Sequence, residues 1–474
     1  MSPTRSRGAY PTFRYLAAMS AEAVGGGMYV PVSLLYFHRV AGLPLGQVGA
    51  GLTVAALVGL AASPLFGALV DRVGARTVVA VGFTARAAAF LSYPFVHQWW
   101  QLLLGAVLAA LGDRSFQASV QALISELAEG AERQRMIATQ SSLRNAGFGV
   151  GGLLASLAMG LAADWAYHAV VLGSAAGLAL AAVLVATLRM PGPGHRERSG
   201  RGRAARERAV RTKGADRTSG PDRTSGTGRT AEARPGGYRA VLRDRPYLGL
   251  TLATVPLAFC YSSLSVVLPV YTTQVLDVSA ALPGLLFTVN TVLVAVAQLP
   301  VNTRITKHRR TRVSALGGVV FAAAFLGFAL LSAVDAGVLL VSGLLLTTVL
   351  YTGGELLHSP SSGALSTDAA PDGLRGRYLA VYYMSWSVAK AAAPALFTAL
   401  LALSPTATWL LLAGGVLLGS LALVRLEPHL PPHALRPAPA DGGEDAGREP
   451  GTDGGHDAGD GDPTHATATR SRRS

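Results

Sequence analysis

Long apolar segments, separated by short charged stretches, limit most strongly what this chain can fold into. Of its 474 residues, 50% are hydrophobic and only 14% are charged, whereas about a quarter of the residues of a soluble domain are charged. A run of about 20 apolar residues, wound as a helix, crosses the ~30 Å hydrocarbon core of a bilayer. The pattern predicts twelve membrane-spanning segments, near residues 13–38, 46–69, 77–96, 99–125, 138–162, 166–188, 247–274, 282–303, 312–332, 336–360, 376–402 and 406–426.

These predicted spans are expected to be helices rather than strands. The strands of a membrane barrel need about ten residues of strict apolar–polar alternation, and the runs of this chain are apolar all round. A helix also satisfies its own backbone hydrogen bonds without water. The expected fold is therefore an all-α membrane protein whose twelve transmembrane helices form two bundles of six.

A polar segment divides the chain into two blocks of similar length. Residues 191–239 are rich in Arg, Gly, Ser, Thr and Pro, and such a segment cannot bury enough apolar surface to order itself. We expect it to be a basic cytoplasmic linker between an N-terminal bundle (1–190) and a C-terminal bundle (240–427), followed by a disordered cytoplasmic tail (428–474). Two six-span blocks are typical of transporters built from structural repeats, with the substrate site between the halves near the midplane.

The basic residues indicate how the spans are oriented. The net charge of +14 would suggest nucleic-acid binding in a soluble protein. However, fifteen Lys or Arg and only six Asp or Glu lie between Arg196 and Arg245, and most other Lys and Arg residues follow alternate spans. This is the positive-inside pattern. It predicts a multi-pass protein of the bacterial inner membrane with both termini in the cytoplasm, a retained signal anchor at the first span, and no nucleic-acid partner.

The turn after the second predicted span has a distinctive sequence. Gly67 permits close approach of a neighbouring helix, and Gly74 lets the chain reverse because glycine adopts positive φ freely. Asp71 can accept a hydrogen bond at the N-terminus of a neighbouring helix. The residues that carry the pattern are Gly67, Leu69, Asp71, Arg72, Gly74 and Arg76.

This turn resembles the signature loop of the major facilitator superfamily, Gly-x-Leu-x-Asp-Arg-x-Gly-Arg-Arg, with Ala75 as the departure from it. The resemblance covers all twelve predicted spans. It implies that the loop is a conformational latch that holds the outward-facing state from the cytoplasmic side, with Asp71 as its acid. The corresponding turn of the second half has Arg304 where the acid would fall, which predicts a weaker latch there.

Two further segments resemble signatures of this family. Arg114-Ser-Phe-Gln117-Ala118 in the fourth span is similar to Arg-x-x-Gln-Gly. Four glycines of the fifth span match the antiporter signature only in part, and tight helix packing alone also explains them; they are Gly147, Gly149, Gly151 and Gly152. Within the family, the chain resembles most the bacterial twelve-span multidrug branch of drug:proton antiporters.

Ionisable side chains inside the spans are the candidates for proton coupling, because a charge in a membrane is costly unless it has a function or a partner. Glu22 lies about 14 Å from the cytoplasmic end of its span at ~1.5 Å per residue. An acid held between a desolvating environment and an arginine can bind and release a proton. We expect Glu22 or Asp113 to be that acid and Arg114 to modulate it. Structural pairing is the alternative for each; Gln117 and Glu355 complete the candidate set.

Aromatic and polar residues on the same faces are candidates for the substrate cavity. Aromatic rings can hold an apolar or cationic compound, although most aromatic side chains in helices serve packing. The candidates are Tyr29, Tyr261, Asn290, Tyr351, Tyr383, Trp386 and Lys390.

The sequence therefore predicts a monomeric, proton-coupled transporter that exports small amphipathic compounds by alternating access. The Gly-x-x-x-x-Gly-Lys-Ser/Thr loop of nucleotide hydrolases is absent from the sequence, so an ion gradient is the expected energy source. We expect no cofactor and no metal. An uptake symporter for a sugar, amino acid or peptide remains an alternative, as does a transport-inactive sensor. A membrane enzyme acting on lipid-linked substrates would need paired carboxylates, a His–acid dyad or metal ligands, and we find no convincing set.

Overall fold

The computed structural model describes residues 9–128, 130–161, 164–188, 238–305, 307–335, 337–371 and 374–436. These residues belong to one compact unit, Met1–Pro437. Within these ranges the chain forms helices joined by short connections and has no strand, so the all-α prediction is confirmed. Residues 191–237 of the predicted linker and residues 437–474 of the predicted tail lie outside the described residues.

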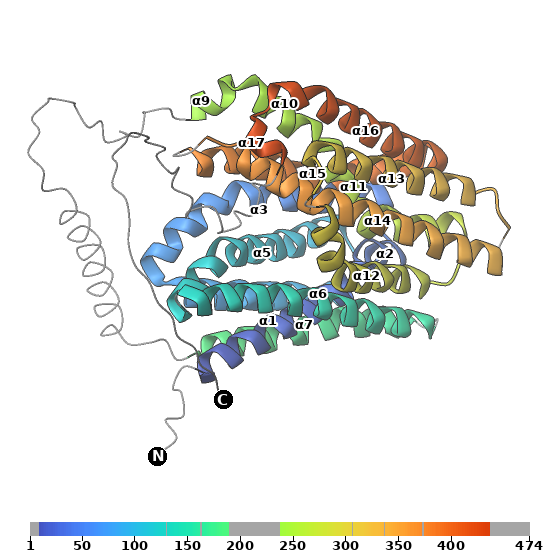
Figure 1. Ribbon diagram of the computed structural model, residues 1–474. Helices are drawn as coiled ribbons and strands as arrows, with labels where there is room; N and C mark the ends of the chain where they lie inside the picture. Colours follow the sequence, from blue (N-terminus) through green and yellow to red (C-terminus); the bar gives the residue numbers. More distant parts are fainter. Residues whose placement is uncertain are drawn as a thin grey trace, which may run out of the picture. The chain divides into compact units, whose positions relative to one another are not determined.

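Within the described residues, the first half of the chain forms six long helical segments, which run from blue to green in Figure 1. The first segment consists of two helices, because Pro31 lacks a backbone donor and stands where the helix is interrupted. The elements are α1 (Ala9–Tyr29), α2 (Ser33–Arg39), α3 (Leu45–Val73), α4 (Ala75–Ser92), η1 (Tyr93–Phe95), α5 (Trp99–Leu127), α6 (Gly130–Gly160) and α7 (Asp164–Ala186).

The second half repeats this plan, with its first span again divided. Pro256 lies in the first turn of α11, just after the break at Thr254, and the π-helical turn η2 follows Pro269. The elements are α9 (Tyr238–Arg243), α10 (Arg245–Ala253), α11 (Val255–Val270), η2 (Tyr271–Val275), α12 (Leu282–Ile305), α13 (Arg310–Leu331), α14 (Val338–Asp368), α15 (Arg375–Leu403), α16 (Pro405–Leu426), η3 (Glu427–His429) and α17 (Pro432–Leu435). The described chain thus continues past the predicted start of the tail at residue 428.

Among the described residues, nine helical segments are long and apolar enough to cross a membrane. The other three predicted spans correspond to α1, α5 and α6, which have 21, 29 and 31 residues. These three helices carry more polar residues, among them Glu22, Asp113 and Arg144. Of these three charged residues, Glu22 is buried, Asp113 is partly buried and Arg144 is exposed.

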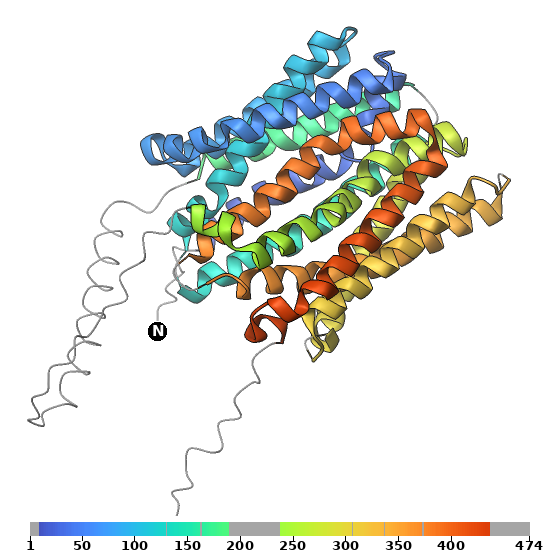
Figure 2. The ribbon, with the colours of Figure 1, turned by 90° about the horizontal axis from the view of Figure 1, so that it is seen from above.

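The two halves contact each other through two main helix pairs. Helix α3 packs against α15, and α6 packs against α12; Figure 2 shows α15 (orange) running beside α3 (blue). We call the end with residues 73–75 and 307–309 the motif end. We call the opposite end, with residues 40–44, 96–98 and 276–281, the far end.

Candidate functional site

Glu22 and Arg86 form an ion pair inside the N-terminal half. Arg86 Nη1 of α4 donates to Glu22 Oε1 of α1 over 2.9 Å, and the two side chains are only 10% and 6% exposed. Two charges can stay this deeply buried only because each neutralises the other. Glu22 is a candidate predicted from the sequence, but the cation beside it is Arg86 rather than the predicted Arg114.

Asp113 and Gln117 lie one turn apart on α5. Gln117 Nε2 donates to Asp113 Oδ2 over 2.6 Å, and Gln117 is exposed. Arg114 is the next residue after Asp113 and is partly exposed. The carboxylate of Asp113 is therefore held by a neutral amide of its own helix.

Glu355 and Asn290 come together in the C-terminal half. Asn290 Nδ2 of α12 donates to Glu355 Oε2 of α14 over 2.9 Å and also to Thr352 Oγ1 over 3.1 Å. Asn290 is buried and Glu355 is partly buried. Glu355 is predicted from the sequence as a coupling residue and Asn290 as a cavity residue, whereas the two form one hydrogen-bonded unit.

Lys390 on α15 lies where charges from both halves act together. Asp113, Arg114 and Arg144 of the N-terminal half all interact electrostatically with it, and so does Glu355 of the C-terminal half. Three cations and two acids thus share one central region, which we call the central charge cluster. Arg144 is not among the residues predicted from the sequence, although it is an arginine six residues inside the predicted fifth span.

Aromatic rings beside this region form a compact group in the C-terminal half. The Tyr261 ring centroid lies 5.2 Å from that of Trp386, 5.6 Å from Phe321 and 6.0 Å from His358. Tyr261 Oη, His358 Nε2 and Trp386 Nε1 are buried without a hydrogen-bond partner among the described residues. His358 was not selected from the sequence as a site residue, although it follows Glu355 by three positions.

The other aromatic candidates have different surroundings. Tyr29 packs against Phe90 with ring centroids 4.3 Å apart inside the N-terminal half. Tyr351 is fully buried and donates to the Cys260 carbonyl over 3.1 Å. Tyr383 is 55% exposed. In this conformation Tyr29 and Tyr351 each pack within one half, so the cavity role expected for them stays a prediction.

The signature turn joins α3 to α4 at the motif end. Gly74 has a φ of 84°, the left-handed region expected for it, and a Cβ placed on Gly67 would meet no heavy atom within 4 Å. Asp71 and Arg72 are exposed, and Arg76 Nη1 donates to the Leu188 carbonyl over 2.9 Å. The close helix approach that Gly67 permits is therefore not made in this conformation.

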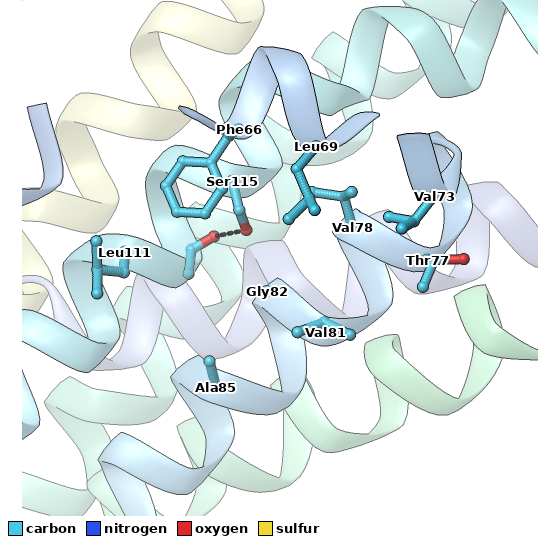
Figure 3. A pocket seen from close by; sticks show the side chains of 11 residues that line it. Phe66, Leu69, Val73, Thr77, Val78, Val81, Gly82, Ala85, Leu111 and Ser115 are labelled. Carbon is cyan, nitrogen blue, oxygen red and sulfur yellow. Dashed lines mark hydrogen bonds between the residues drawn. The ribbon is translucent and has the colours of Figure 1, made fainter. Parts of the chain in front are cut away.

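An apolar groove of about 240 Å³ adjoins this turn, between α3, α4 and α5 (Figure 3). Leu69 and Val73 at the end of α3 line it, together with Val81 of α4, and all three are exposed. The Ser115 hydroxyl at its edge donates to the Gly112 carbonyl over 2.8 Å, so the groove offers little polar capacity. The groove can therefore contact mainly apolar groups.

At the far end the two halves are packed closely. A Cβ on Gly152 of α6 would lie 2.9 Å from Thr288 Oγ1, and one on Gly284 of α12 would lie 2.9 Å from the Gly152 carbonyl oxygen. Ser156 Oγ also donates to the Ala281 carbonyl over 2.6 Å. Gly147, by contrast, packs on α1, where a Cβ would lie 2.6 Å from Ala23 Cβ. The glycines of α6 thus allow close packing on both of its faces.

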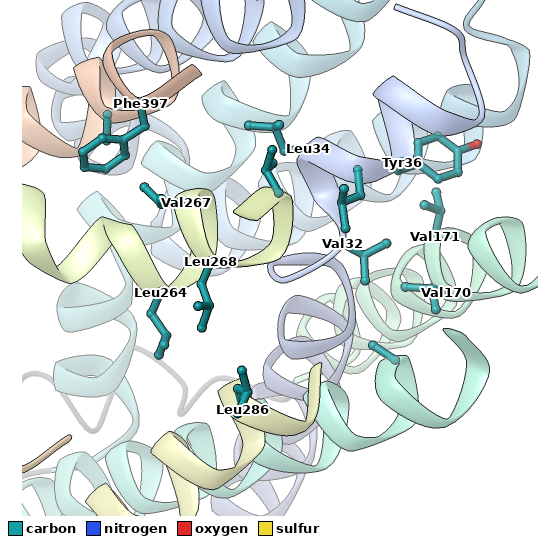
Figure 4. Packing of buried hydrophobic residues seen from close by; sticks show 14 of the residues in the cluster. Val32, Leu34, Tyr36, Val170, Val171, Leu264, Val267, Leu268, Leu286 and Phe397 are labelled. Atoms are coloured by element: carbon teal, nitrogen blue, oxygen red, sulfur yellow. The ribbon is translucent and has the colours of Figure 1, made fainter. Parts of the chain in front are cut away.

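The second helix pair and an apolar cluster complete this closure. The backbone N–H of Ala395 donates to Thr53 Oγ1 over 3.0 Å, and a Cβ on Gly49 would clash with Thr398. Buried side chains of both halves gather beside these contacts (Figure 4). They include Val32, Leu34, Leu264, Val267, Leu268, Leu286 and Phe397. The far end is therefore sealed in this conformation.

Comparison with known proteins agrees with this architecture. The family model described as Major Facilitator Superfamily matches residues 15–354 and 250–468. A multidrug resistance protein MdtH of Aeromonas hydrophila is 31% identical over 180 residues, which are 38% of this chain and 44% of that protein. MdtH of Cronobacter sakazakii is 30% identical over 145 residues, 30% of this chain and 36% of that protein. The matches thus span less than half of these relatives.

Solved transporter structures share the fold. A POT family transporter in complex with 5-aminolevulinic acid has a TM-score of 0.65 at 14% identity, covering 88% of this chain and 96% of that one. The nucleoside transporter NupG has a TM-score of 0.66 at 11% identity, covering 88% and 99%. Together with the family match over most of the sequence, the two six-helix halves and the signature turn show that this chain belongs to the Major Facilitator Superfamily.

Proposed function

We propose that this protein is a proton-coupled exporter of small amphipathic compounds in the bacterial inner membrane and works by alternating access. The observation that carries the proposal is the central charge cluster, in which Asp113, Arg114 and Arg144 of one half and Glu355 of the other act electrostatically on the same lysine, Lys390. A transporter rather than an enzyme is the reading that agrees with the family. The MdtH relatives, named for multidrug resistance, favour export.

In this proposal the structure represents the inward-open state. The positive-inside pattern supports a cytoplasmic position for the motif end. The far end, sealed by α3 with α15 and by α6 with α12, then faces the periplasm. Gly67 is uncovered at the motif end, in agreement with a released cytoplasmic latch.

Proton binding would change the balance of charge in the central charge cluster, between the two halves. Asp113 and Glu355 both attract Lys390, and each also accepts a hydrogen bond from an amide, Gln117 or Asn290. Protonation of either carboxyl removes one attraction to the lysine and leaves the three cations of the cluster less compensated. The relative stability of the two states would thereby depend on protonation.

The substrate would bind beside this cluster. Tyr261 and Trp386 would offer aromatic faces to an apolar or cationic body. The polar atoms of Tyr261, His358 and Trp386, which are buried without a partner among the described residues, would offer hydrogen bonds in a conformation that exposes them. A site of apolar walls with a few polar groups fits amphipathic molecules.

The test is a drug-susceptibility and ethidium-efflux panel in a pump-deficient bacterial host, with and without an uncoupler. We expect protection that the uncoupler abolishes. We expect Glu355→Gln or Asp113→Asn to reduce efflux at least about tenfold, the scale of one lost charge interaction of ~1.4 kcal/mol. Asp335→Asn, in the exposed α13–α14 connection, is the matched control and should leave efflux unchanged.

Two outcomes would count against the proposal. Efflux insensitive to the uncoupler would exclude proton coupling. Accumulation of solutes without protection would favour the uptake symporter instead.

A further inference from the structure

A basic pocket lies at the motif end of the C-terminal half, apart from the central charge cluster. It has a volume of about 340 Å³. Its walls combine basic side chains with two apolar ones, and they come from the α12–α13 connection, from the start of α13 and from the segment after α17. The lining residues are Lys307, His308, Arg309, Arg312, Val313, Leu316 and Arg436.

Among the described residues, the pocket carries more positive charge than its neighbouring carboxylate balances. Glu427 of η3 pairs with Arg309, lies 3.7 Å from Arg312 Nε and accepts a hydrogen bond from Thr311 Oγ1 over 2.6 Å. This single carboxylate is shared by two arginines, while Lys307 and Arg436 line the same pocket. The side chains of Arg309 and Arg312 are 39% and 69% exposed, so their remaining donors are accessible to an anion.

The pocket is held in place by the end of the described chain. Arg310 pairs with Asp368 of α14 and donates to the Ala434 carbonyl of α17 over 3.2 Å. His433 also contacts the Asp368 carbonyl over 3.0 Å. These bonds bring the segment with Arg436 back onto α13, which explains why residues predicted to be tail are part of the folded unit.

One wall of the pocket continues onto the apolar face of a membrane-spanning helix. Leu316 lies on α13, whose segment Arg310–Leu331 is apolar enough to cross a bilayer, and it is 53% exposed. Leu316 is four residues beyond Arg312, so it lies about 6 Å further along the helix at ~1.5 Å per residue. A ligand with a phosphate at one end and an alkyl chain at the other matches both parts of this site.

We propose that this pocket binds the headgroup of an anionic phospholipid, with its phosphodiester on Lys307, Arg309, Arg312 and Arg436 and an acyl chain along Val313 and Leu316. Arginine and lysine are the usual partners of phosphate oxygens, and basic pockets at a membrane face bind anionic headgroups. The site is independent of the direction of transport. It also accounts for the basic residues that the second-half turn retains without the acid of the first-half turn.

The test uses the purified full chain in detergent and native mass spectrometry with added phosphatidylglycerol or phosphatidylcholine. The double variant Lys307→Gln/Arg436→Gln is expected to bind phosphatidylglycerol about thirtyfold more weakly, since each basic residue near anionic lipid contributes ~1 kcal/mol. Phosphatidylcholine binding should not change. Arg133→Gln/Arg135→Gln, two exposed arginines of α6, is the matched control and should bind phosphatidylglycerol as the wild type does.

Further variants and a competition experiment test whether a loss of binding reflects misfolding, and whether the ligand is a lipid or free phosphate. Lys307→Arg/Arg436→Lys keeps both charges and should retain phosphatidylglycerol affinity. Leu316→Gln should weaken phosphatidylglycerol binding, and millimolar inorganic phosphate should not displace the lipid from the wild type. Three results would each overturn the proposal. The first is that Lys307→Gln/Arg436→Gln and Lys307→Arg/Arg436→Lys lose equal phosphatidylglycerol affinity. The others are an equal loss in the α6 control, and complete displacement of the lipid by inorganic phosphate.

Discussion

At the scale of single residues, the Glu22–Arg86 pair allows a structural role of Glu22 to be distinguished from a role in proton coupling. Glu22→Gln leaves Arg86 charged, buried and without its carboxylate, and removal of one partner of a buried pair costs about 3–5 kcal/mol. We therefore expect a clear fall in the midpoint of thermal unfolding in detergent, and a partial recovery in Glu22→Gln/Arg86→Gln, which removes both charges. Circular dichroism during heating measures this directly.

An unchanged midpoint in Glu22→Gln would contradict the structural role of the pair. If transport were lost at the same time, Glu22 would be a proton-coupling acid, which is the role predicted for it from the sequence. Asp335→Asn, an exposed acid, controls for the loss of one negative charge at a site without a buried partner.

The individual residues also show what sequence reasoning can reach. The selection of Glu22, Asp113 and Glu355 followed from the cost of a charge inside an apolar run, which is a local property. The partner of Asp113, Gln117, lies on the same helix, whereas Arg86 and Asn290 lie on other helices than the acids they contact. Only the helical spacing of Gln117 is visible in sequence; contacts between helices depend on packing angles and rotation, which no single run of residues encodes.

At the scale of helices, the apolar runs predict the spans well because hydrocarbon thickness fixes their length. The breaks were not predicted: α1 ends before Pro31, and α10 ends before Pro256. The reason is that a divided helix has the same mean apolarity as a continuous one. Short elements such as η3 and α17 are likewise stabilised by residues distant in sequence, as in the pair of Glu427 with Arg309. Their Pro-rich sequence, taken alone, predicts a disordered tail.

The glycines of α6 give a prediction about helix packing between the halves. Gly152→Leu would place its Cβ 2.9 Å from Thr288 Oγ1 and 3.0 Å from Phe287, so α6 and α12 must separate at the far end. We expect faster maleimide labelling of a reporter cysteine, Thr398→Cys, on the other helix pair, in a Cys260→Ala background. Thr398 is only 3% exposed in this conformation, which gives the reporter a low starting rate.

Gly414→Leu is the matched control, because a Cβ there would meet no heavy atom within 4 Å. Labelling of Thr398→Cys that is equally slow in Gly152→Leu and Gly414→Leu would show that α6 and α12 do not hold the far end closed.

At the scale of the whole molecule, two glycines at opposite ends should bias the same equilibrium in opposite directions. A side chain at Gly67 fits this conformation without a clash, since no heavy atom lies within 4 Å of the added Cβ. It would obstruct the closed motif end that alternating access requires, where a neighbouring helix must approach this glycine. Gly67→Leu is therefore expected to slow labelling of Thr398→Cys and to abolish efflux while leaving the unfolding midpoint unchanged. The double variant with Gly152→Leu should label at an intermediate rate, because a population shift is the sum of two opposing biases on one two-state equilibrium. Normal efflux by Gly67→Leu would mean that the motif end never closes on this turn, and the motions of the two ends would then have to be explained without a latch at Gly67–Arg76.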